Sequence, residues 1–383
     1  MGTRKKIGLS IVFDNETNSG IVNYIISFIS GFNLLPDQNK PAITIFYSEK
    51  APLQQIQETN YPYLTFQPLP TKRYSQKGIK WFINAVAFRL FKKHYFENTV
   101  PANQVDYIFP VFAFDYYYKK IKTKIHWLVD FNPYYFPHHY EDKGAGFRNW
   151  HSSVAKLTDD VVVSSYSSYE DYKKFYPEHK NKVHVVRFAS MLPDFSDTDL
   201  LSLKNRYGIS DPYFITPNQF WEHKNHIVIL EALKKLKDQN KTINVVFTGS
   251  TKVSRGLGFQ YDKLKDFVDR NNLNANVHFL GVIDRKEQLA LMKGAEAIIQ
   301  PSLFEGWSTL VEESKALQKN IILSDIPVHR EQIEHNCTFF DPHSSDDLVE
   351  KIKTYLNTKP VPKDVNYEQF KQRFANDLLN IFR

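Results

Sequence analysis

Short runs of apolar residues alternate with longer amphipathic stretches along most of this chain. Apolar runs with the length of buried strands occupy residues 7–13, 42–48, 105–112, 124–131, 160–167 and 182–189, and then 213–220, 243–250, 276–283, 295–302 and 320–327. Apolar residues at helical spacing separate many of these runs, at 22–32, 227–237, 261–271, 285–293 and 309–317. Apolar strands joined by amphipathic helices predict an α/β fold with parallel sheets that are covered on both faces.

The two series of strands predict two Rossmann-like domains. The 383 residues are long for one domain and sufficient for two hydrophobic cores. Residues 190–209, which contain Pro, Ser and Asp, separate the series, so we expect an N-terminal domain over 1–205 and a C-terminal domain over 206–365. Ligands of such sheets bind at the carboxyl ends of the strands, and the cleft between two facing domains is the expected site.

Residues 298–317 place acidic residues at the junction between a predicted buried strand and a helix. Ser308 or Thr309 can cap that helix, and Thr309 with Glu312 fits a capping box. The free N–H groups of residues 306–310 and the helix dipole predict an anion site.

Two further acids of this junction have no role in the predicted cap. Glu305 precedes the predicted anion site and Glu313 lies one turn inside the helix, while Gly306 lets the backbone approach a ligand closely. A ligand with phosphates and hydroxyls would use both the amides and the carboxylates. The alternative is that Glu312 and Glu313 only complement the helix dipole, which leaves Glu305 unexplained.

The spacing of Glu305 and Glu313, with seven residues between them, resembles the E-x7-E motif of family 4 retaining glycosyltransferases of the GT-B fold (glycosyl transferases group 1). The wider string 300–332 is similar to the same region of bacterial members that build surface polysaccharides. The resemblance implies that Glu305 contacts the donor sugar and Glu313 the nucleotide ribose. It assigns sugar and diphosphate binding to the intervening residues, Gly306, Trp307, Ser308, Thr309 and Leu310.

Residues 216–233 resemble the family's donor-phosphate loop, in which an Arg and a Lys neutralise the diphosphate. Lys224 matches the Lys and precedes an amphipathic helix, where it is well placed as a phosphate point charge. The Arg position falls at or near Gln219, which is uncharged, and His223 is the candidate substitute. The alternative for Lys224 is a solvated lysine at the start of a helix.

Residues 126–142 resemble the family segment whose His-Asp pair lies near the reacting sugar. Asp130 matches the Asp and Val129 stands at the His position, so only Asp130 is carried over as catalytic, together with Glu305 and Lys224. Asp130 could equally stabilise a loop turn. The histidines His126, His138 and His139 are expected to be surface or loop residues.

Two glycines complete the predicted donor site. Gly20, where the family usually has a glycine pair after the first strand, is expected near the donor phosphates, and Gly281 is expected to be a wall of the base pocket. Simple turn geometry is the alternative for both. The family resemblance also implies that the last helix, 366–383, packs back on the N-terminal domain.

The resemblance implies an enzyme that transfers a hexose from a nucleoside-diphosphate sugar to a glycan or lipid-linked acceptor, with retention of configuration, in cell-surface polysaccharide synthesis. The nucleotide sugar is a co-substrate, and neither a cofactor nor a metal is expected. Since the sequence offers no evident pair of carboxylates for nucleophile and acid, a front-face mechanism fits. The alternatives are a nucleotide-sugar epimerase of the same fold and a non-catalytic nucleotide-sugar binding protein.

The net charge of +7 permits an anionic partner and does not select one. Because no recognition motif accompanies it, a nucleic-acid partner is not expected. The single cysteine, Cys337, fits a reducing compartment, and we expect a cytoplasmic protein, with peripheral contact to the inner face of the membrane left open.

Two segments have a structural and a functional interpretation. The acidic string 196–199 contains D-x-D, the metal motif of another glycosyltransferase fold, but it reads as a helix N-cap. The basic, aromatic and helix-periodic stretch 71–96 could contact a membrane surface or a lipid acceptor. We favour a helix whose apolar side covers the N-terminal sheet.

Overall fold

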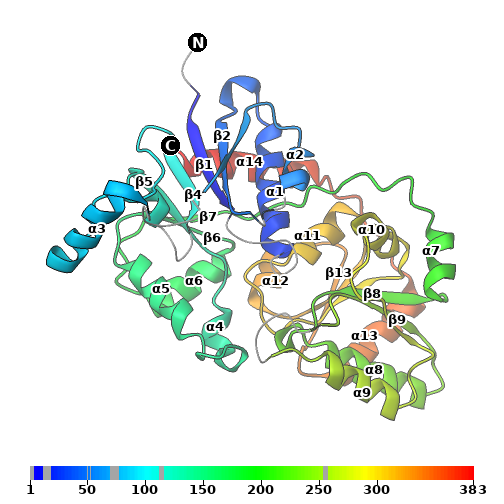
Figure 1. The fold of residues 1–383 in the computed structure, drawn as a ribbon. Helices are drawn as coiled ribbons and strands as arrows, with labels where there is room; N and C mark the ends of the chain where they lie inside the picture. The colour runs from blue at the N-terminus through cyan, green and yellow to red at the C-terminus, as the bar shows by residue number, and fades with distance from the viewer. Residues whose placement is uncertain are drawn as a thin grey trace.

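The computed structural model describes residues 4–11, 19–49, 51, 53–69, 77–111, 116–252 and 258–383. These residues form two parallel β-sheets in consecutive halves of the chain, each with helices on both faces (Figure 1). Two parallel sheets covered by helices confirm the predicted α/β class with two Rossmann-like halves. The exact domain boundary near residue 205 stays a prediction.

The N-terminal sheet has seven strands and the C-terminal sheet has six. In spatial order the first contains β3 (Leu64–Pro68), β2 (Ala42–Tyr47), β1 (Lys6–Ile11), β4 (Tyr107–Val111), β5 (Thr123–Leu128), β6 (Asp160–Val163) and β7 (Val183–Val185). The second contains β10 (Val277–Phe279), β9 (Asn244–Thr248), β8 (Tyr213–Pro217), β11 (Ile298–Gln300), β12 (Ile321–Ser324) and β13 (Cys337–Phe340).

Helices of the N-terminal half cover their sheet through separate apolar clusters. The helices of this half are α1 (Ser19–Asn33), α2 (Leu53–Gln57), α3 (Gly78–Phe91), α4 (Asn132–Tyr135), α5 (Ala145–Ala155) and α6 (Tyr166–Phe175). One cluster packs α1 and α2 on the sheet through residues such as Phe28 and Ile56. Another packs α5 and α6 through Val154 and Tyr172.

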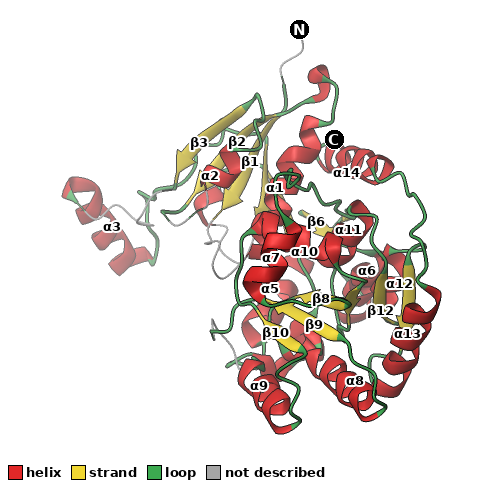
Figure 2. Ribbon diagram, turned by 90° about the vertical axis from the view of Figure 1, so that its right-hand side faces the viewer, coloured by secondary structure: helices red, strands yellow, loops and turns green. Residues whose placement is uncertain are grey.

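Helices of the C-terminal half form one cluster on each face of the second sheet. They are α7 (Leu200–Tyr207), α8 (His226–Asp238), α9 (Tyr261–Arg270), α10 (Arg285–Gly294), α11 (Thr309–Ala316), α12 (Pro327–Gln332) and α13 (Ser345–Thr358). Helices α8, α9 and α13 share one cluster, and α7, α10 and α11 share the other. Figure 2 shows α8, α9 and α13 together at the end of the molecule farthest from β1 and β2.

The last helix, α14 (Glu368–Ile381), leaves the C-terminal half and lies beside α1 in both views (Figures 1 and 2). Phe374 and Leu378 belong to the apolar cluster of the N-terminal sheet. The helices approach so closely at Gly31 that a Cβ there would lie 3.1 Å from Leu378.

The elements predicted by range coincide with observed strands and helices, but two edge strands and the helices α2, α4, α5, α6, α12 and α13 were not predicted. Neither β3 nor β13 was predicted, because residues 64–68 and 337–340 are mostly only half-buried and do not belong to long apolar runs. The predicted N-cap at 196–199 is confirmed, since Asp199 accepts hydrogen bonds from the N–H groups of Leu201 and Ser202 and begins α7.

The prediction that the apolar side of 71–96 covers the N-terminal sheet is wrong for the described part of that stretch. Within α3 only Asn84 and Ala87 are buried, and the large apolar side chains face solvent. The helix projects from the rest of the N-terminal half (Figure 1).

Among the helices of the described residues, none is both long enough and apolar enough to span a membrane. This finding applies to the helices of the described ranges and leaves other kinds of membrane contact open.

Candidate active site

The carboxyl ends of β8 and β11 lie side by side at the point where the strand order of the second sheet reverses. Residues 218–224 follow β8 and residues 301–308 follow β11, so the two predicted donor-binding segments meet there. The loop after β5, which contains Asp130, approaches the same place from the N-terminal half. A reversal of strand order is where doubly wound sheets bind their ligands.

Glu305 is held at this junction by three hydrogen bonds to one oxygen. Its Oε1 accepts from Lys224 Nζ at 2.7 Å, Gln300 Nε2 at 2.8 Å and Ser302 Oγ at 2.7 Å. The side chain of Glu305 is 9% exposed and that of Lys224 is 19% exposed. The other oxygen, Oε2, has no hydrogen-bond partner among the residues that the structure describes, so it is available to a ligand.

Opposing effects act on the pKa of Glu305. Burial raises it, but the charge of Lys224, with the hydrogen bond from Lys224, outweighs burial and brings the pKa below its ordinary value. The carboxylate is therefore ionised at neutral pH. For Asp130 the balance is reversed, because burial and the negative charge of Glu305 raise its pKa despite a hydrogen bond of 2.9 Å from the Asn132 N–H.

Gly306 packs closely against the loop after β5 of the N-terminal half. A Cβ at residue 306 would lie 2.6 Å from the carbonyl oxygen of Val129 and 2.8 Å from the Cβ of Asp130. The carbonyl of Gly306 also accepts a hydrogen bond of 3.3 Å from Ser168 Oγ. Glycine is therefore needed for close approach, and it brings Asp130 next to the loop that carries Glu305.

The cap of α11 differs from the predicted capping box. Ser308 is the N-cap and its Oγ accepts from the Val311 N–H at 3.4 Å. The Glu312 side chain points into the interior and accepts from Lys315 and Tyr367, so it cannot return to cap the helix. The capping box of Thr309 and Glu312 was wrong because tertiary partners compete for the carboxylate.

Most backbone N–H groups of the predicted anion site remain available. The Ser308 N–H donates to Gln332 Oε1 at 3.2 Å. Those of Gly306, Trp307, Thr309 and Leu310 find no acceptor within the described part of the chain. Donors at the start of an eight-residue helix, beside Lys224, suit a negatively charged ligand.

Glu313 has a partner that the sequence did not indicate. Arg285, the first residue of α10, donates to both oxygens of Glu313 and also to Gln288 Oε1 at 2.6 Å. Gln288 in turn donates to Thr248 Oγ1 at 2.8 Å. The only sequence signal was a basic residue at a predicted helix start after a strand, which is common on protein surfaces.

Gln219 and His223 lie on the loop after β8 and lack a positive charge. Gln219 Oε1 accepts from the Ser250 N–H at 3.0 Å and so links the ends of β8 and β9. Burial, with the neighbouring charge of Lys224, lowers the pKa of His223 to about 3, so this side chain is neutral at pH 7. Its Nδ1 has no hydrogen-bond partner among the described residues. In this structure His223 therefore offers a hydrogen bond in place of the missing Arg charge.

Three other residues were predicted to bind the nucleotide sugar, and the structure gives each of them a different environment. Trp307 packs against the N-terminal cluster and donates from Nε1 to the Phe188 carbonyl at 3.0 Å. Gly281 has a φ of +70° at the end of β10, and its carbonyl accepts from the Gly249 N–H at 2.9 Å. Gly20 lies in the first turn of α1, and residues 12–18 before it are outside the described ranges.

Of the three histidines in the segment 126–142, His138 is exposed as predicted, whereas His126 and His139 are buried. His126 is an interior residue of β5 that bonds Asp159 at 3.1 Å. His138 and the buried His139 both direct Nε2 at Glu222 Oε2, at 3.1 and 3.3 Å, across the two halves of the chain. Among the described residues, His138, His139 and Glu222 form the group whose ligand atoms lie close enough together to hold a metal ion.

His329 was not singled out in the sequence although it is completely buried near this site. Burial lowers its pKa to about 4, and the negative charge of Glu305 acts in the opposite direction. Its Nδ1 bonds the Ser324 carbonyl at 2.9 Å, and its Nε2 has no partner among the described residues. The mixed sequence of the short helix α12 (Pro327–Gln332) gave no signal that this side chain would be buried near the site.

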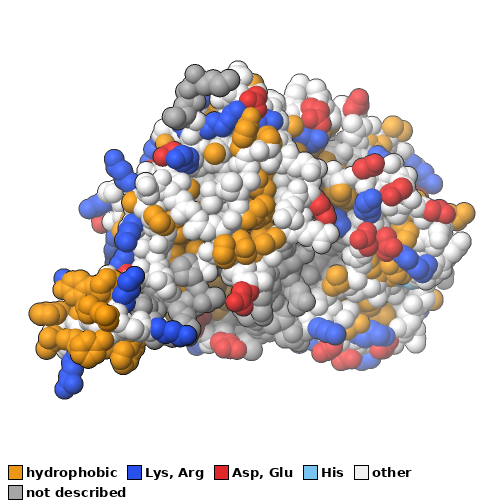
Figure 3. Space-filling view, turned by 45° about the horizontal axis from the view of Figure 1, so that its top comes forward, with side chains coloured by type: hydrophobic (Ala, Val, Ile, Leu, Met, Phe, Trp, Pro, Cys, Tyr) orange, Lys and Arg blue, Asp and Glu red, His pale blue; other side chains and the backbone are white. Residues whose placement is uncertain are grey.

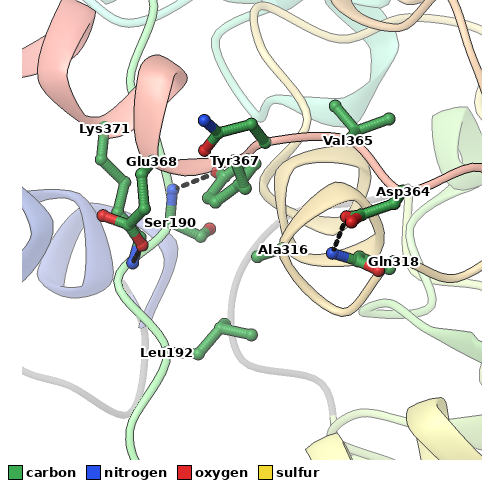
Figure 4. A pocket seen from close by; sticks show the side chains of 10 residues that line it. Ser190, Leu192, Ala316, Gln318, Asp364, Val365, Tyr367, Glu368 and Lys371 are labelled. Atoms are coloured by element: carbon green, nitrogen blue, oxygen red, sulfur yellow. Dashed lines mark hydrogen bonds and ion pairs between the residues drawn. The ribbon is translucent and has the colours of Figure 1, made fainter.

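A cavity of about 490 Å³ lies apart from these residues, where the segment 364–371 crosses α11 (Figure 4). Tyr367 accepts there from the Ser190 N–H at 2.8 Å and donates to Glu312 Oε2 at 2.8 Å. No predicted site residue is among the described residues that line it. Glu312 therefore connects α11 to the returning chain, which is a structural role.

A family model assigns the part of the chain that holds this arrangement. Residues 203–372 match the model described as "Glycosyl transferases group 1". The chain carries a glycosyl transferases group 1 domain. Glu305, Lys224 and the N-terminus of α11 all lie within that domain.

Relatives with curated names match over part of their length. The O-antigen chain mannosyltransferase RfbU of Salmonella typhimurium is 25% identical over 225 residues, which cover 58% of each chain. The serotype-specific mannosyltransferase WbdA of Escherichia coli is 22% identical over 244 residues, or 59% of this chain and 29% of the relative. The alignment thus spans about three fifths of RfbU and less than a third of WbdA.

Solved structures match nearly the whole chain and show the fold. A glycosyltransferase from Rickettsia africae has a TM-score of 0.63 at 15% identity, and covers 100% of this chain and 95% of its own. Anabaena HepE in complex with UDP-glucose has a TM-score of 0.65 at 14% identity, covering 98% and 96%. The group 1 domain is therefore the C-terminal half of a GT-B fold.

Proposed function

We propose that this chain transfers a hexose from a nucleoside-diphosphate sugar to a glycan or lipid-linked acceptor in cell-surface polysaccharide synthesis. The observation that carries the proposal is the ionised Glu305, which is bonded to Lys224 through Oε1 and has Oε2 free among the described groups. It stands before the unpaired amides of α11. The names of the relatives RfbU and WbdA make mannose the first donor sugar to test.

In this proposal the site separates sugar recognition from charge neutralisation. Oε2 of Glu305 accepts a hydrogen bond from a hydroxyl of the donor hexose. The Lys224 ammonium has three N–H donors, so it can bond Glu305 and the diphosphate at the same time. The amides of Thr309 and Leu310 stabilise the negative charge that grows on the leaving phosphate. Glu313, oriented by Arg285, accepts from the nucleotide ribose.

The proposed reaction retains configuration by a front-face route. The bond from the anomeric carbon to the phosphate oxygen breaks, a bond to the acceptor oxygen forms on the same face, and the phosphate takes the acceptor proton. Asp130, beside Gly306, is placed to orient the acceptor side of this exchange. The site therefore uses electrostatic stabilisation and needs no protein nucleophile.

The function is tested by offering the purified chain mannose and glucose donors on several nucleotides, with and without polysaccharide or lipid-linked acceptors. We expect one donor to raise Tm, since a ligand stabilises the state it binds, and nucleoside diphosphate release to require an acceptor. NMR of the product should show the anomeric configuration of the donor. A changed sugar formed from donor alone would identify an epimerase, and donor binding without release would identify a binding protein.

We expect transfer to persist after divalent metals are removed with EDTA, because Lys224 and the α11 amides supply the positive charge. The His138, His139 and Glu222 group provides the control, since it is the metal-capable cluster of the described residues. Transfer rates of the protein and of Glu222→Gln should be equal with and without EDTA. If EDTA abolishes transfer and Mn²⁺ restores it in the unsubstituted protein but not in Glu222→Gln, this cluster binds a catalytically required metal and the expectation of metal independence is wrong.

A further inference from the structure

The surface of α3 is apolar in a way that the proposed transfer reaction does not explain. Ile79, Phe82, Ile83, Val86 and Leu90 follow the spacing of a single helix face, and Ile79, Phe82 and Leu90 are 79%, 63% and 66% exposed. We call these five residues the α3 stripe. Figure 3 shows hydrophobic side chains gathered over α3 at the left edge of the molecule.

The opposite side of α3 explains why the stripe faces outward. Asn84 Oδ1 accepts from the N–H groups of Tyr95 and Phe96 at 2.8 Å, and Asn84 Nδ2 donates to the Phe96 carbonyl at 2.6 Å. These bonds turn the polar residue toward the protein. An ordinary amphipathic helix of a globular protein has the reverse orientation, so α3 presents an apolar face that needs a partner.

Charge identifies the partner. Residues 77–96 include Lys77, Lys80, Arg89, Lys92 and Lys93, all exposed, and contain no Asp or Glu. A second copy of the chain docked through the stripe would bring two such sets of positive charge together. An anionic bilayer offers apolar chains to the stripe and negative headgroups to its basic rim.

We propose that α3 docks this protein on an anionic lipid bilayer, with the α3 stripe in the boundary between headgroups and acyl chains. Trp81, Phe88 and Phe91 are also exposed, and at about 100° per residue they lie on the sides of α3 that face away from the stripe. The large aromatic side chain of Phe82, within the stripe, suits that boundary. The helix has 14 residues, about 21 Å in length at 1.5 Å per residue, and lies in the plane of the surface without crossing it.

Vesicle flotation tests this proposal without requiring enzymatic activity. We expect the protein to float with vesicles containing phosphatidylglycerol and to float much less with pure phosphatidylcholine. Phe82→Ser with Leu90→Ser should weaken binding about tenfold or more, because the apolar contribution is lost. Lys80→Glu with Arg89→Glu should weaken binding to anionic vesicles by about fivefold per residue replaced, or more, and less at high salt.

The matched control replaces two equally exposed apolar residues elsewhere, Leu201→Ser with Val361→Ser, and should bind as the unsubstituted protein does. In a Trp81→Phe background, Phe82→Trp places a tryptophan in the stripe, and brominated lipids should quench its fluorescence more strongly than they quench Trp81 of the unsubstituted protein. All these sites are on the surface, so unchanged melting curves will show that each variant folds.

Failure to bind phosphatidylglycerol vesicles, or binding of the stripe variant equal to that of the control, would overturn the proposal. A stable dimer in solution that Phe82→Ser with Leu90→Ser converts to a monomer would also overturn it, and would assign the stripe to a second copy.

Discussion

Glu305→Gln should lower kcat/KM for hexose transfer by about 10²–10³-fold, the scale seen when one preorganised charge-stabilising group is removed. Gln keeps the size of the side chain and one acceptor oxygen for Lys224, Gln300 and Ser302. It removes the negative charge at the atom that the proposal places against a donor hydroxyl. Initial rates of nucleoside diphosphate release, measured over a range of donor concentrations at fixed acceptor, give the kcat/KM that checks this expectation.

The control for this variant is Glu350→Gln, which removes an exposed carboxylate paired with Lys353 on α13 of the same half of the chain. Its rate should stay within about a factor of two, as expected for a surface substitution. Circular dichroism and Tm should show that Glu305→Gln still folds. Turnover of a folded Glu305→Gln variant near that of the control would contradict the role assigned to Glu305.

The fold was predictable because buried parallel strands leave a strong signal in the sequence. The two series of apolar runs contain β1 and β8, the strands from which each sheet is built outward in both directions. The edge strands β3 and β13 were missed because they are half-buried and stand outside any long apolar run, whereas the half-buried edge strands β7 and β10 lie inside the apolar runs 182–189 and 276–283. Periodicity reports burial, so it is weakest where a strand is half exposed.

The residues of the candidate site were predictable only where a local motif contained them. Glu305 and Lys224 stand 81 positions apart and meet at 2.7 Å, and only the two motifs placed each of them at a strand end. Arg285 belongs to no such motif, and His329, although it lies in the string 300–332, was given no role there. Their positions depend on how α10 and α12 pack, which a sequence pattern does not encode.

Side-chain roles depended on tertiary partners in the same way. Glu312 fitted a capping box by its spacing, yet the returning segment with Tyr367 draws it into the interior. The apolar face of α3 fitted a core helix, yet Asn84 turns it outward. In both cases the local pattern was compatible with two environments, and a distant contact decided between them.

Lys224→Met should lower the rate of transfer and should also reverse the direction in which the pKa of Glu305 is shifted. In the unsubstituted protein the charge of Lys224 keeps the pKa of Glu305 below its ordinary value, against the effect of burial. Without that charge burial dominates, so the pKa of Glu305 should rise above its ordinary value. We expect kcat/KM to fall by about 10²–10³-fold, with a higher KM for the donor, because the diphosphate loses its cation.

The pH dependence gives a second readout of the same substitution. A lowered folded-state pKa contributes stability above the unfolded pKa, and this contribution is lost as pH falls through the folded value. A raised pKa has the opposite sign, since its contribution is present at low pH and is lost as pH rises. As pH rises from 5 to 8, the Tm of Lys224→Met should therefore fall relative to that of the unsubstituted protein. Melting curves of both proteins in one buffer series measure this difference.

Lys234→Met is the matched control, because Lys234 pairs with Asp238 on the exposed side of α8. Its Tm difference from the unsubstituted protein should be small and nearly constant with pH, as expected for an exposed ion pair. The double variant Lys224→Met with Glu305→Gln should lose most of the pH-dependent fall, since Glu305 no longer titrates and Asp130 is the carboxyl group left beside it. If the fall persists in the double variant, another group causes it, and the coupling of Lys224 to Glu305 inferred from their 2.7 Å contact is wrong.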